Sequence, residues 1–198
     1  DVSRPPAKLR NGAPAACGRG RSGKDALARR RRDALRAAEH FVEALRRRSK
    51  AAFFMKTLIL QRICSSFASG RLTAERMLRK EALEDEDEEK QSIEGTLRGM
   101  TEEERHYLES IVEELSRPEA HDPKVAAVRY FLSEHRTDGK NWLEHGCIIF
   151  SQYYDTVRTL ALELGSVLPG EPVAVYAGAG KSGIHLDGDF ASVEREEI

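Results

Sequence analysis

One loop of the sequence combines residue types that bind nucleotide phosphates. Residues 177–183 read Ala-Gly-Ala-Gly-Lys-Ser-Gly, and Gly-Lys-Ser is the end of a phosphate-binding loop. That loop needs a further glycine five positions before the glycine of Gly-Lys-Ser, so that the backbone can wrap the phosphates, but Val175 stands there. Gly183 and the Asp-Gly-Asp sequence at 187–189 also argue against a helix directly after the loop. We therefore predict a flexible loop with one basic side chain, Lys181, rather than an ATP site.

The other titratable side chains do not match a metal site or a catalytic triad. The six histidines lack the spacings of zinc ligands, and the three cysteines share no close spacing, so a disulfide framework and a zinc knuckle are not supported. Asp187 and Asp189 could hold a cation, although two carboxylates in a loop are more often turn formers. No nucleophile elbow is present. We expect no catalytic residue and no metal site in this chain.

Charge is divided unevenly along the chain. The 198 residues have a formal net charge of −1, yet residues 1–80 hold 21 Lys and Arg against 6 Asp and Glu (+15), and residues 81–198 hold 11 against 27 (−16). A basic half can neutralise nucleic-acid phosphates, and an acidic half can repel them or cover the basic half. Arg29, Arg30, Arg31 and Arg32 are candidate phosphate ligands, with a second cluster at 46–48. A solvated helix face is the commoner reason for such clusters.

Two apolar runs frame the only α/β pattern in the sequence. Cys147–Phe150 and Val173–Tyr176 both read as strands covered on two faces, and Val157, Leu160 and Leu164 recur between them at helical spacing. A crossover of this length predicts a parallel, right-handed βαβ unit with the loops after both strands at one edge of the sheet. The predicted fold class is therefore α/β, with a helical N-terminal half followed by a partial parallel βαβ unit.

The rest of the chain divides by composition. Residues 1–23 are basic and rich in Gly and Pro, which predicts disorder or a displaced segment. Residues 24–80 favour helices, with a break near Ser69-Gly70, and residues 81–100 begin with an acidic tract that predicts a linker. Residues 101–198 form the remaining region.

Several local signals mark helix ends within residues 101–198. Thr101 with Glu104 predicts a capping box that opens a helix through about Ser116. Asp122-Pro123 predicts a second helix start, with a stop near Gly139. Residues 178–189 predict a loop, and Ser192 predicts the cap of a last helix.

The order of these features resembles the opening of the second RecA-like lobe of Swi/Snf-type, superfamily-two helicases. Phe150-Ser151-Gln152 matches the end of the fourth motif of that family, and Tyr176-Ala177-Gly178 matches the end of its next strand. Arg195 stands where the family has an arginine near the start of the following helix. Residues 58–66 are similar to the helical Arg-x-x-Ser-Ser segment that joins the two lobes in bacterial members. The resemblance covers residues 50–198 and is specific around 122–178. It implies that residues 24–80 are the basic helical segment between the lobes and that residues 101–198 are a partial RecA-like helicase C-terminal lobe.

The resemblance implies a nucleic-acid role for three residues. Ser151 and Gln152 would lie close to the nucleic-acid backbone, and Gly178 would let the chain approach it. The alternative is that Ser151 and Gln152 satisfy backbone groups at a strand end and that Gly178 makes a turn. One departure from the family is an insertion at 180–190 before the last helix, which puts the usual contacts of this loop in doubt.

The sequence also lacks the parts of a motor that perform catalysis. The phosphate loop and DExH carboxylates of the first lobe and the later arginine finger are not found in it. We therefore expect a fragment of an ATP-dependent DNA helicase or translocase, inactive alone, in which ATP and Mg²⁺ are cofactors of the complete parent enzyme only. The implied partners are the backbone of double-stranded DNA and the first motor lobe.

Two other functional classes stay open. A non-enzymatic helical adaptor would use the Arg-rich helix and the acidic tract to bind a protein partner or nucleic acid. A small nucleotide-binding enzyme would depend on the incomplete phosphate loop and ranks last. No apolar run approaches the ~20 residues of a membrane span, and no signal-peptide core is present, so we expect a cytoplasmic protein with no membrane partner.

Overall fold

The computed structural model describes residues 21–81, 95–117, 122–178, 180–186 and 188–198. These residues form two compact units, one extending to Tyr130 and the other running from Phe131 to Ile198. The N-terminal part is mostly helical, as predicted, and a small three-stranded antiparallel sheet lies near the C-terminus. The predicted parallel βαβ unit is therefore wrong. None of the described helices is long and apolar enough to span a lipid bilayer.

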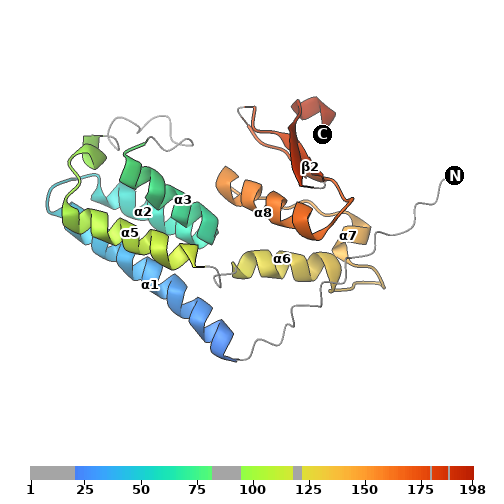
Figure 1. Ribbon diagram of the computed structural model, residues 1–198, viewed down its shortest axis with the longest axis horizontal. Coiled ribbons are helices and arrows are strands. Elements are labelled where there is room, and N and C mark those ends of the chain that lie inside the picture. The colour runs from blue at the N-terminus through green and yellow to red at the C-terminus, as the bar shows by residue number, and fades with distance from the viewer. Residues whose placement is uncertain (1–20, 82–94, 118–121, 179, 187) are drawn as a thin grey trace. The chain divides into compact units, whose positions relative to one another are not determined.

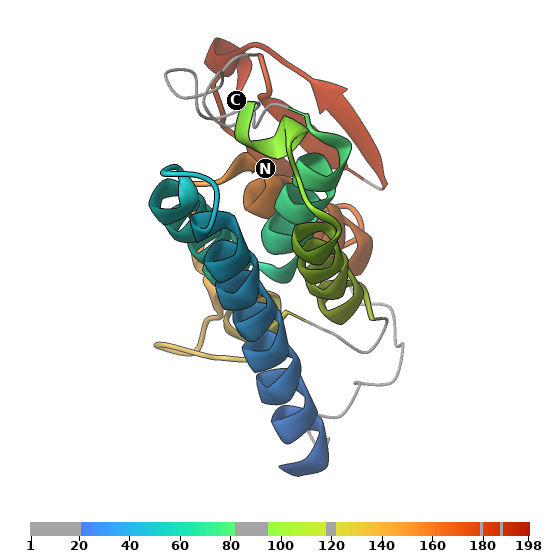
Figure 2. The ribbon, with the colours of Figure 1, turned by 90° about the vertical axis from the view of Figure 1, so that its left-hand side faces the viewer.

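Four of the described helices build a bundle in the first unit: α1 (Arg21–Arg46), α2 (Ala52–Ser65), α3 (Phe67–Arg79) and α5 (Glu102–Ser116). α1 and α3 each pack against both α2 and α5 (Figure 1, Figure 2). Apolar residues at helical spacing on the four helices meet in one core, because packing the helices together removes most of their apolar surface from water. Its fully buried members include Phe41, Leu45, Met55, Ile59, Met77, Leu108 and Ile111.

The chain turns between α2 and α3 at Ser66, so the predicted break at Ser69-Gly70 is wrong. Ser66 is extended (φ −157°, ψ 160°), and its hydroxyl accepts a hydrogen bond from the backbone N–H of Ser69 (3.0 Å), which caps α3. Gly70 lies within α3, where a Cβ would be 2.8 Å from Cγ1 of Ile63 and 2.9 Å from its Cα. This glycine therefore permits a close approach of α3 to α2 and does not end a helix.

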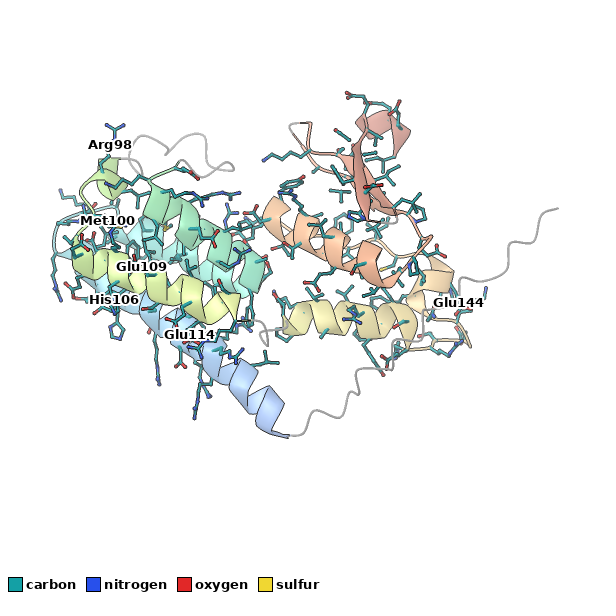
Figure 3. All side chains as sticks on the ribbon, viewed as in Figure 1. Arg98, Met100, His106, Glu109, Glu114 and Glu144 are labelled. Carbon is teal, nitrogen blue, oxygen red and sulfur yellow. The ribbon has the colours of Figure 1, made fainter. Side chains whose placement is uncertain are left out.

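The capping box predicted at Thr101 and Glu104 is confirmed at the start of α5. The Thr101 hydroxyl accepts a hydrogen bond from the Glu104 N–H (3.2 Å), and the Glu104 carboxylate accepts one from the Thr101 N–H (3.0 Å). Glu104 is buried, and the Arg48 guanidinium donates to both of its carboxylate oxygens at 2.8 and 2.7 Å. This ion pair joins the segment after α1 to the start of α5. Figure 3 shows the turn before α5 and the helix itself, with Arg98, Met100, His106, Glu109 and Glu114 labelled.

Asp122 precedes α6 (Pro123–Ser133), as predicted, and also contacts the start of α3. One carboxylate oxygen accepts a hydrogen bond from the Lys124 N–H, and the other accepts one from the Phe67 N–H, both at 2.8 Å. The Lys124 ammonium donates to the carbonyl of Cys64 at the end of α2 (2.7 Å). A carboxylate beside two helix N-termini interacts favourably with both helix dipoles. α6 ends at Ser133, before the stop predicted near Gly139.

The second unit contains α7 (Trp142–His145), α8 (Tyr154–Val167) and the strands β1 (Val173–Val175), β2 (Gly183–Leu186) and β3 (Asp189–Ser192). The strands pair in the order β1-β2-β3, and both pairs are antiparallel. α8 packs against β1 and β2, and a Cβ on Gly165 of this helix would overlap the ring of His185 on β2. The predicted helix between the two apolar runs is confirmed as α8. A strand also forms at the second run, as β1, but Ala174 is exposed and Tyr176, after the strand, is 67% exposed, so the prediction that this strand is covered on both faces is wrong.

The first predicted strand, Cys147–Phe150, is wrong. This segment pairs with no strand in the described chain, and Ile148 and Phe150 are 81% and 89% exposed. A continuous apolar run forms a strand covered on both faces only where neighbouring strands pair with it. The described sheet pairs β1 with β2 and β2 with β3, which leaves Cys147–Phe150 without such a neighbour.

The predicted loop at 178–189 and the predicted last helix at Ser192 are also wrong in part. The loop region contains β2, and Ser192 ends β3, after which only a 3-10 turn forms at Arg195–Glu197. Gly188 has φ +97° between β2 and β3, a backbone conformation that favours glycine. An Asp-Gly pair between two β-prone runs is a hairpin signal, and this pair at 187–188 indicates a hairpin rather than the predicted loop.

Candidate functional site

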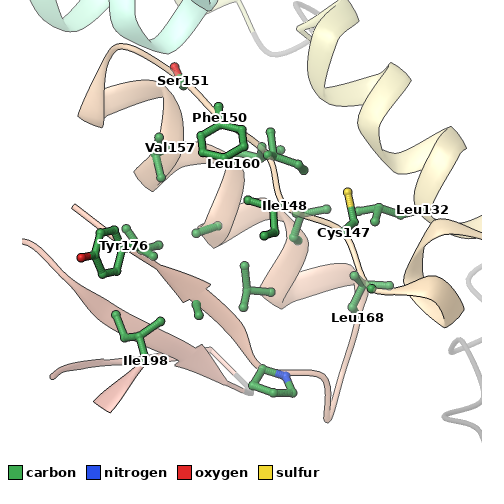
Figure 4. Close-up of a pocket in the computed structure, with 18 of the residues that line it drawn as sticks. Leu132, Cys147, Ile148, Phe150, Ser151, Val157, Leu160, Leu168, Tyr176 and Ile198 are labelled. Atoms are coloured by element: carbon green, nitrogen blue, oxygen red, sulfur yellow. The ribbon is translucent and has the colours of Figure 1, made fainter. Parts of the chain in front are cut away.

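An apolar groove lies in the second unit between residues 146–151, α8 and β1. Its volume is about 800 Å³, and most of the side chains that line it are apolar. Figure 4 shows the side chains that line it, among them Ile148 and Phe150 from the uncovered segment, Val157 and Leu160 from α8, and Tyr176 after β1. A contiguous exposed apolar surface of this kind marks a binding surface more often than a solvated face.

Two sides of the groove expose backbone groups as well as apolar side chains. β1 pairs with β2 on one edge and has no strand on its other edge among the described residues. Within the same residues, Cys147–Phe150 makes no backbone hydrogen bond to another segment. Unpaired backbone beside an apolar surface is the condition under which an added strand can bind. The groove is therefore chemically suited to a further β-strand.

Ser151 and Gln152 lie where the uncovered segment meets α8. The Ser151 hydroxyl accepts a hydrogen bond from the Tyr153 N–H (3.3 Å) and donates to the Tyr153 carbonyl (3.4 Å), so it satisfies local backbone groups. Gln152 is exposed, and its side chain makes no hydrogen bond to a described residue. Contact of these two residues with nucleic acid stays a prediction.

Gly178 opens the turn between β1 and β2 that contains the Gly-Lys-Ser sequence. Its carbonyl accepts a hydrogen bond from the Lys181 N–H (3.1 Å), and the Lys181 ammonium lies 5.0 Å from the ring centroid of Tyr154. The buried Ser182 hydroxyl donates to the Ala177 carbonyl (2.8 Å) and accepts from the Ala177 N–H (3.0 Å). Strand β2 follows this turn, so no helix N-terminus stands behind it to bind phosphate.

The two arginine clusters of the bundle differ in their surroundings. Arg29 and Arg32 are exposed on α1, whereas Arg30 and Arg31 are partly buried and Arg30 interacts within the protein. In the cluster at 46–48, the guanidinium of Arg47 pairs with Glu103 at 2.9 Å, and that of Arg48 pairs with Glu104. The second cluster thus stabilises the bundle, while the first faces solvent in part. Ser151, Gln152 and Gly178 belong to the other compact unit.

One buried residue, His185, has no sequence motif that would indicate its position. His185 is 2% exposed, and neither of its ring nitrogens has a hydrogen-bond partner in the described part of the chain. It lies on the buried face of β2, a position that becomes visible only when β2 is recognised as a strand. Among the described residues, no group of three or more His, Cys, Asp or Glu is placed to hold a metal ion. The pair Asp187 and Asp189 is not fully described, because residue 187 lies outside the described residues.

Comparison with known proteins gives no further identification. The chain matches no protein-family model, no curated protein and no solved structure.

Proposed function

We propose that this chain is part of an ATP-dependent, Swi/Snf-like DNA translocase, in which residues 24–80 join the two motor lobes and residues 101–198 form the first part of the second lobe. The groove beside Cys147–Phe150 is the observation that supports this proposal best. In the complete enzyme, further strands of the lobe fill the groove. The chain alone is inactive, since ATP and Mg²⁺ bind only in the complete parent enzyme.

The energetic argument rests on the exposure of the uncovered segment. Burying a side chain such as Ile or Phe stabilises a protein by about 1.5–3 kcal/mol relative to leaving it in water. Ile148 and Phe150 are 81% and 89% exposed, and both line the groove. Strands added there would bury both side chains and pair the free backbone groups of the segment. A motor lobe supplies such strands from its own chain.

The antiparallel hairpin does not contradict the proposal. β2 and β3 span residues 183–192, and most of this range coincides with the insertion at 180–190 that departs from the family pattern. The hairpin is then an addition to the lobe. Phe150, Ser151, Gln152 and residues 176–178 lie before it, and Arg195 follows it. Ser151, Gln152 and Gly178 remain the proposed contacts with the DNA backbone.

One substitution, made both in this chain and in the complete enzyme, tests whether the groove is filled in the complete enzyme. In the isolated chain, Phe150→Asp should change the free energy of unfolding by less than about 0.5 kcal/mol, since the side chain is already exposed. In the complete enzyme, the same change should abolish DNA-stimulated ATP hydrolysis, because it would bury an unpaired carboxylate. Phe53→Asp on α2, where the ring is 72% exposed, is the matched control and should have little effect in either protein.

Two outcomes would overturn the proposal. One is a coding sequence in which no phosphate loop is encoded before residue 1 and no further RecA-like strands are encoded after residue 198. The other is a complete protein in which Phe150→Asp and Phe53→Asp have the same small effect on ATP hydrolysis. Either outcome would favour the adaptor function, in which the groove binds a strand of a protein partner.

A further inference from the structure

The exposed face of α1 holds a row of arginines. Arg29, Arg32 and Arg36 are spaced i, i+3 and i+7, so they lie along one face of the helix. Ala34 and Phe41, on the opposite face, are buried in the bundle core with exposed fractions of 0% and 1%. Because the core fixes the rotation of α1 about its axis, the three arginines are held toward solvent.

Most of the other described arginines of the bundle interact within the protein, whereas the row is largely unpaired; the partly buried Arg31 next to the row also makes no ion pair with a described residue. Ion pairs with carboxylates engage Arg46, Arg47, Arg48, Arg71, Arg79, Arg105 and Arg117. The side chains of Arg30, Arg62, Arg76, Arg98 and Arg129 take part in other interactions. By contrast, Arg29 and Arg32 make no ion pair with any described residue. Arg36 makes one long ion pair with Asp33 at 3.9 Å, and 72% of its side chain remains exposed.

The row is also accessible to a long ligand. α1 has 26 residues, whereas α2, α3 and α5 have 14, 13 and 15. Both views of the bundle show the N-terminal end of α1 extending past these three helices (Figure 1, Figure 2). Residues 21–36 contain seven Lys and Arg against two Asp, a net charge of +5.

We propose that Arg29, Arg32 and Arg36 form a docking surface for the phosphate backbone of a nucleic acid. The three Cα atoms span about 10 Å at 1.5 Å per residue, a length over which one strand of a duplex presents about three phosphates. Each guanidinium can bind a phosphate through two parallel hydrogen bonds. A nucleic acid fits better than an acidic protein surface, because a duplex carries a charge about every 1.7 Å along its axis, a density that a protein surface reaches only in unusually acidic segments. The surface belongs to the bundle, so the proposal does not rest on the motor function of the other unit.

Fluorescence anisotropy with the full chain and a labelled DNA duplex tests the proposal. Binding should be independent of sequence and should weaken about 40-fold between about 50 and 200 mM salt if three phosphates are neutralised. The triple variant Arg29→Gln, Arg32→Gln, Arg36→Gln should lose most of this affinity and reduce the slope of log K against log salt by about 3. Labelled single-stranded DNA and duplex RNA, run in parallel, show which nucleic acid binds most tightly.

A control triple variant removes the same charge elsewhere on the bundle. Arg46→Gln, Arg79→Gln and Arg117→Gln replace exposed arginines that already pair with glutamates, so this variant should keep both the affinity and the salt slope. Far-UV circular dichroism and thermal unfolding verify that both variants remain folded. Equal losses in the two triple variants, or no binding at low salt, would overturn the proposal. Tighter binding to labelled polyglutamate than to the duplex would do so too and would assign the surface to an acidic protein.

Discussion

At the scale of single residues, Arg48 and Glu104 are the most consequential pair in the bundle. The Glu104 side chain is 1% exposed and accepts hydrogen bonds from Arg48 and from the Thr101 N–H. Arg48 also donates to the Thr96 carbonyl at 2.9 Å. Removing the guanidinium would leave the buried carboxylate with one remaining hydrogen-bond donor. The uncompensated buried charge would lower the stability by more than the intact ion pair contributes to it.

We therefore expect Arg48→Gln to lower the free energy of unfolding of the bundle by about 2–4 kcal/mol. Its neighbour supplies a matched control, since Arg47 and Glu103 form an ion pair whose side chains are 67% and 46% exposed. Arg47→Gln should cost less than about 1 kcal/mol, as exposed ion pairs do. Urea unfolding followed by circular dichroism measures both changes. Similar losses of unfolding free energy in the two variants would show that the burial of Glu104 does not determine the contribution of its ion pair to stability.

At the scale of helices, the contact of α3 with α2 and α5 depends on Gly70. An added Cβ would lie 2.8 Å from Cγ1 of Ile63, 2.9 Å from its Cα and 3.0 Å from Cδ1 of Leu115. The Cα belongs to the backbone of α2 and cannot move unless the helix moves. α2 and α3 therefore lie too close together to leave room for a side chain at position 70.

We predict that Gly70→Ala destabilises the bundle by about 1–3 kcal/mol, although alanine in an open helical position would stabilise it by about 1 kcal/mol. Gly95, which is also helical and has nothing within 4 Å of an added Cβ, is the control. Gly95→Ala should leave the thermal midpoint unchanged or raise it. If Gly70→Ala raised the midpoint as well, α2 and α3 would not be as closely packed as described.

At the scale of the whole molecule, the Gly-Lys-Ser turn does not assemble a phosphate site. The Lys181 ammonium lies over the Tyr154 ring, the Ser182 hydroxyl is bound to Ala177, and a strand follows where a phosphate loop needs a helix. We expect residues 1–198 to show no ATP hydrolysis above background, with or without duplex DNA, in a coupled phosphate-release assay. Turnover that Lys181→Ala removes would contradict this expectation and would favour the nucleotide-binding enzyme.

The sequence alone determined the helical part of this protein well. The capping box at Thr101 and Glu104 and the Asp122-Pro123 start depend on residues within one helical turn, so their chemistry can be read directly from the chain. The amphipathic stripe of α8 is local in the same sense. The position of the turn between α2 and α3 was missed, because Gly70 is needed for a contact with Ile63 and only the folded bundle shows that contact.

Only the tertiary structure decided which apolar run becomes a strand and which arginines stay free. Val173–Val175 pairs with β2, whereas Cys147–Phe150 pairs with no strand among the described residues and is exposed. Strand formation depends on hydrogen bonds to distant residues, and an apolar run cannot specify that partner by itself. The arginines follow the same rule, since Arg29 and Arg48 look alike in sequence but only Arg48 meets a buried carboxylate. A sequence encodes local helix geometry directly, but the environment of each side chain is created by the parts of the chain that pack against it.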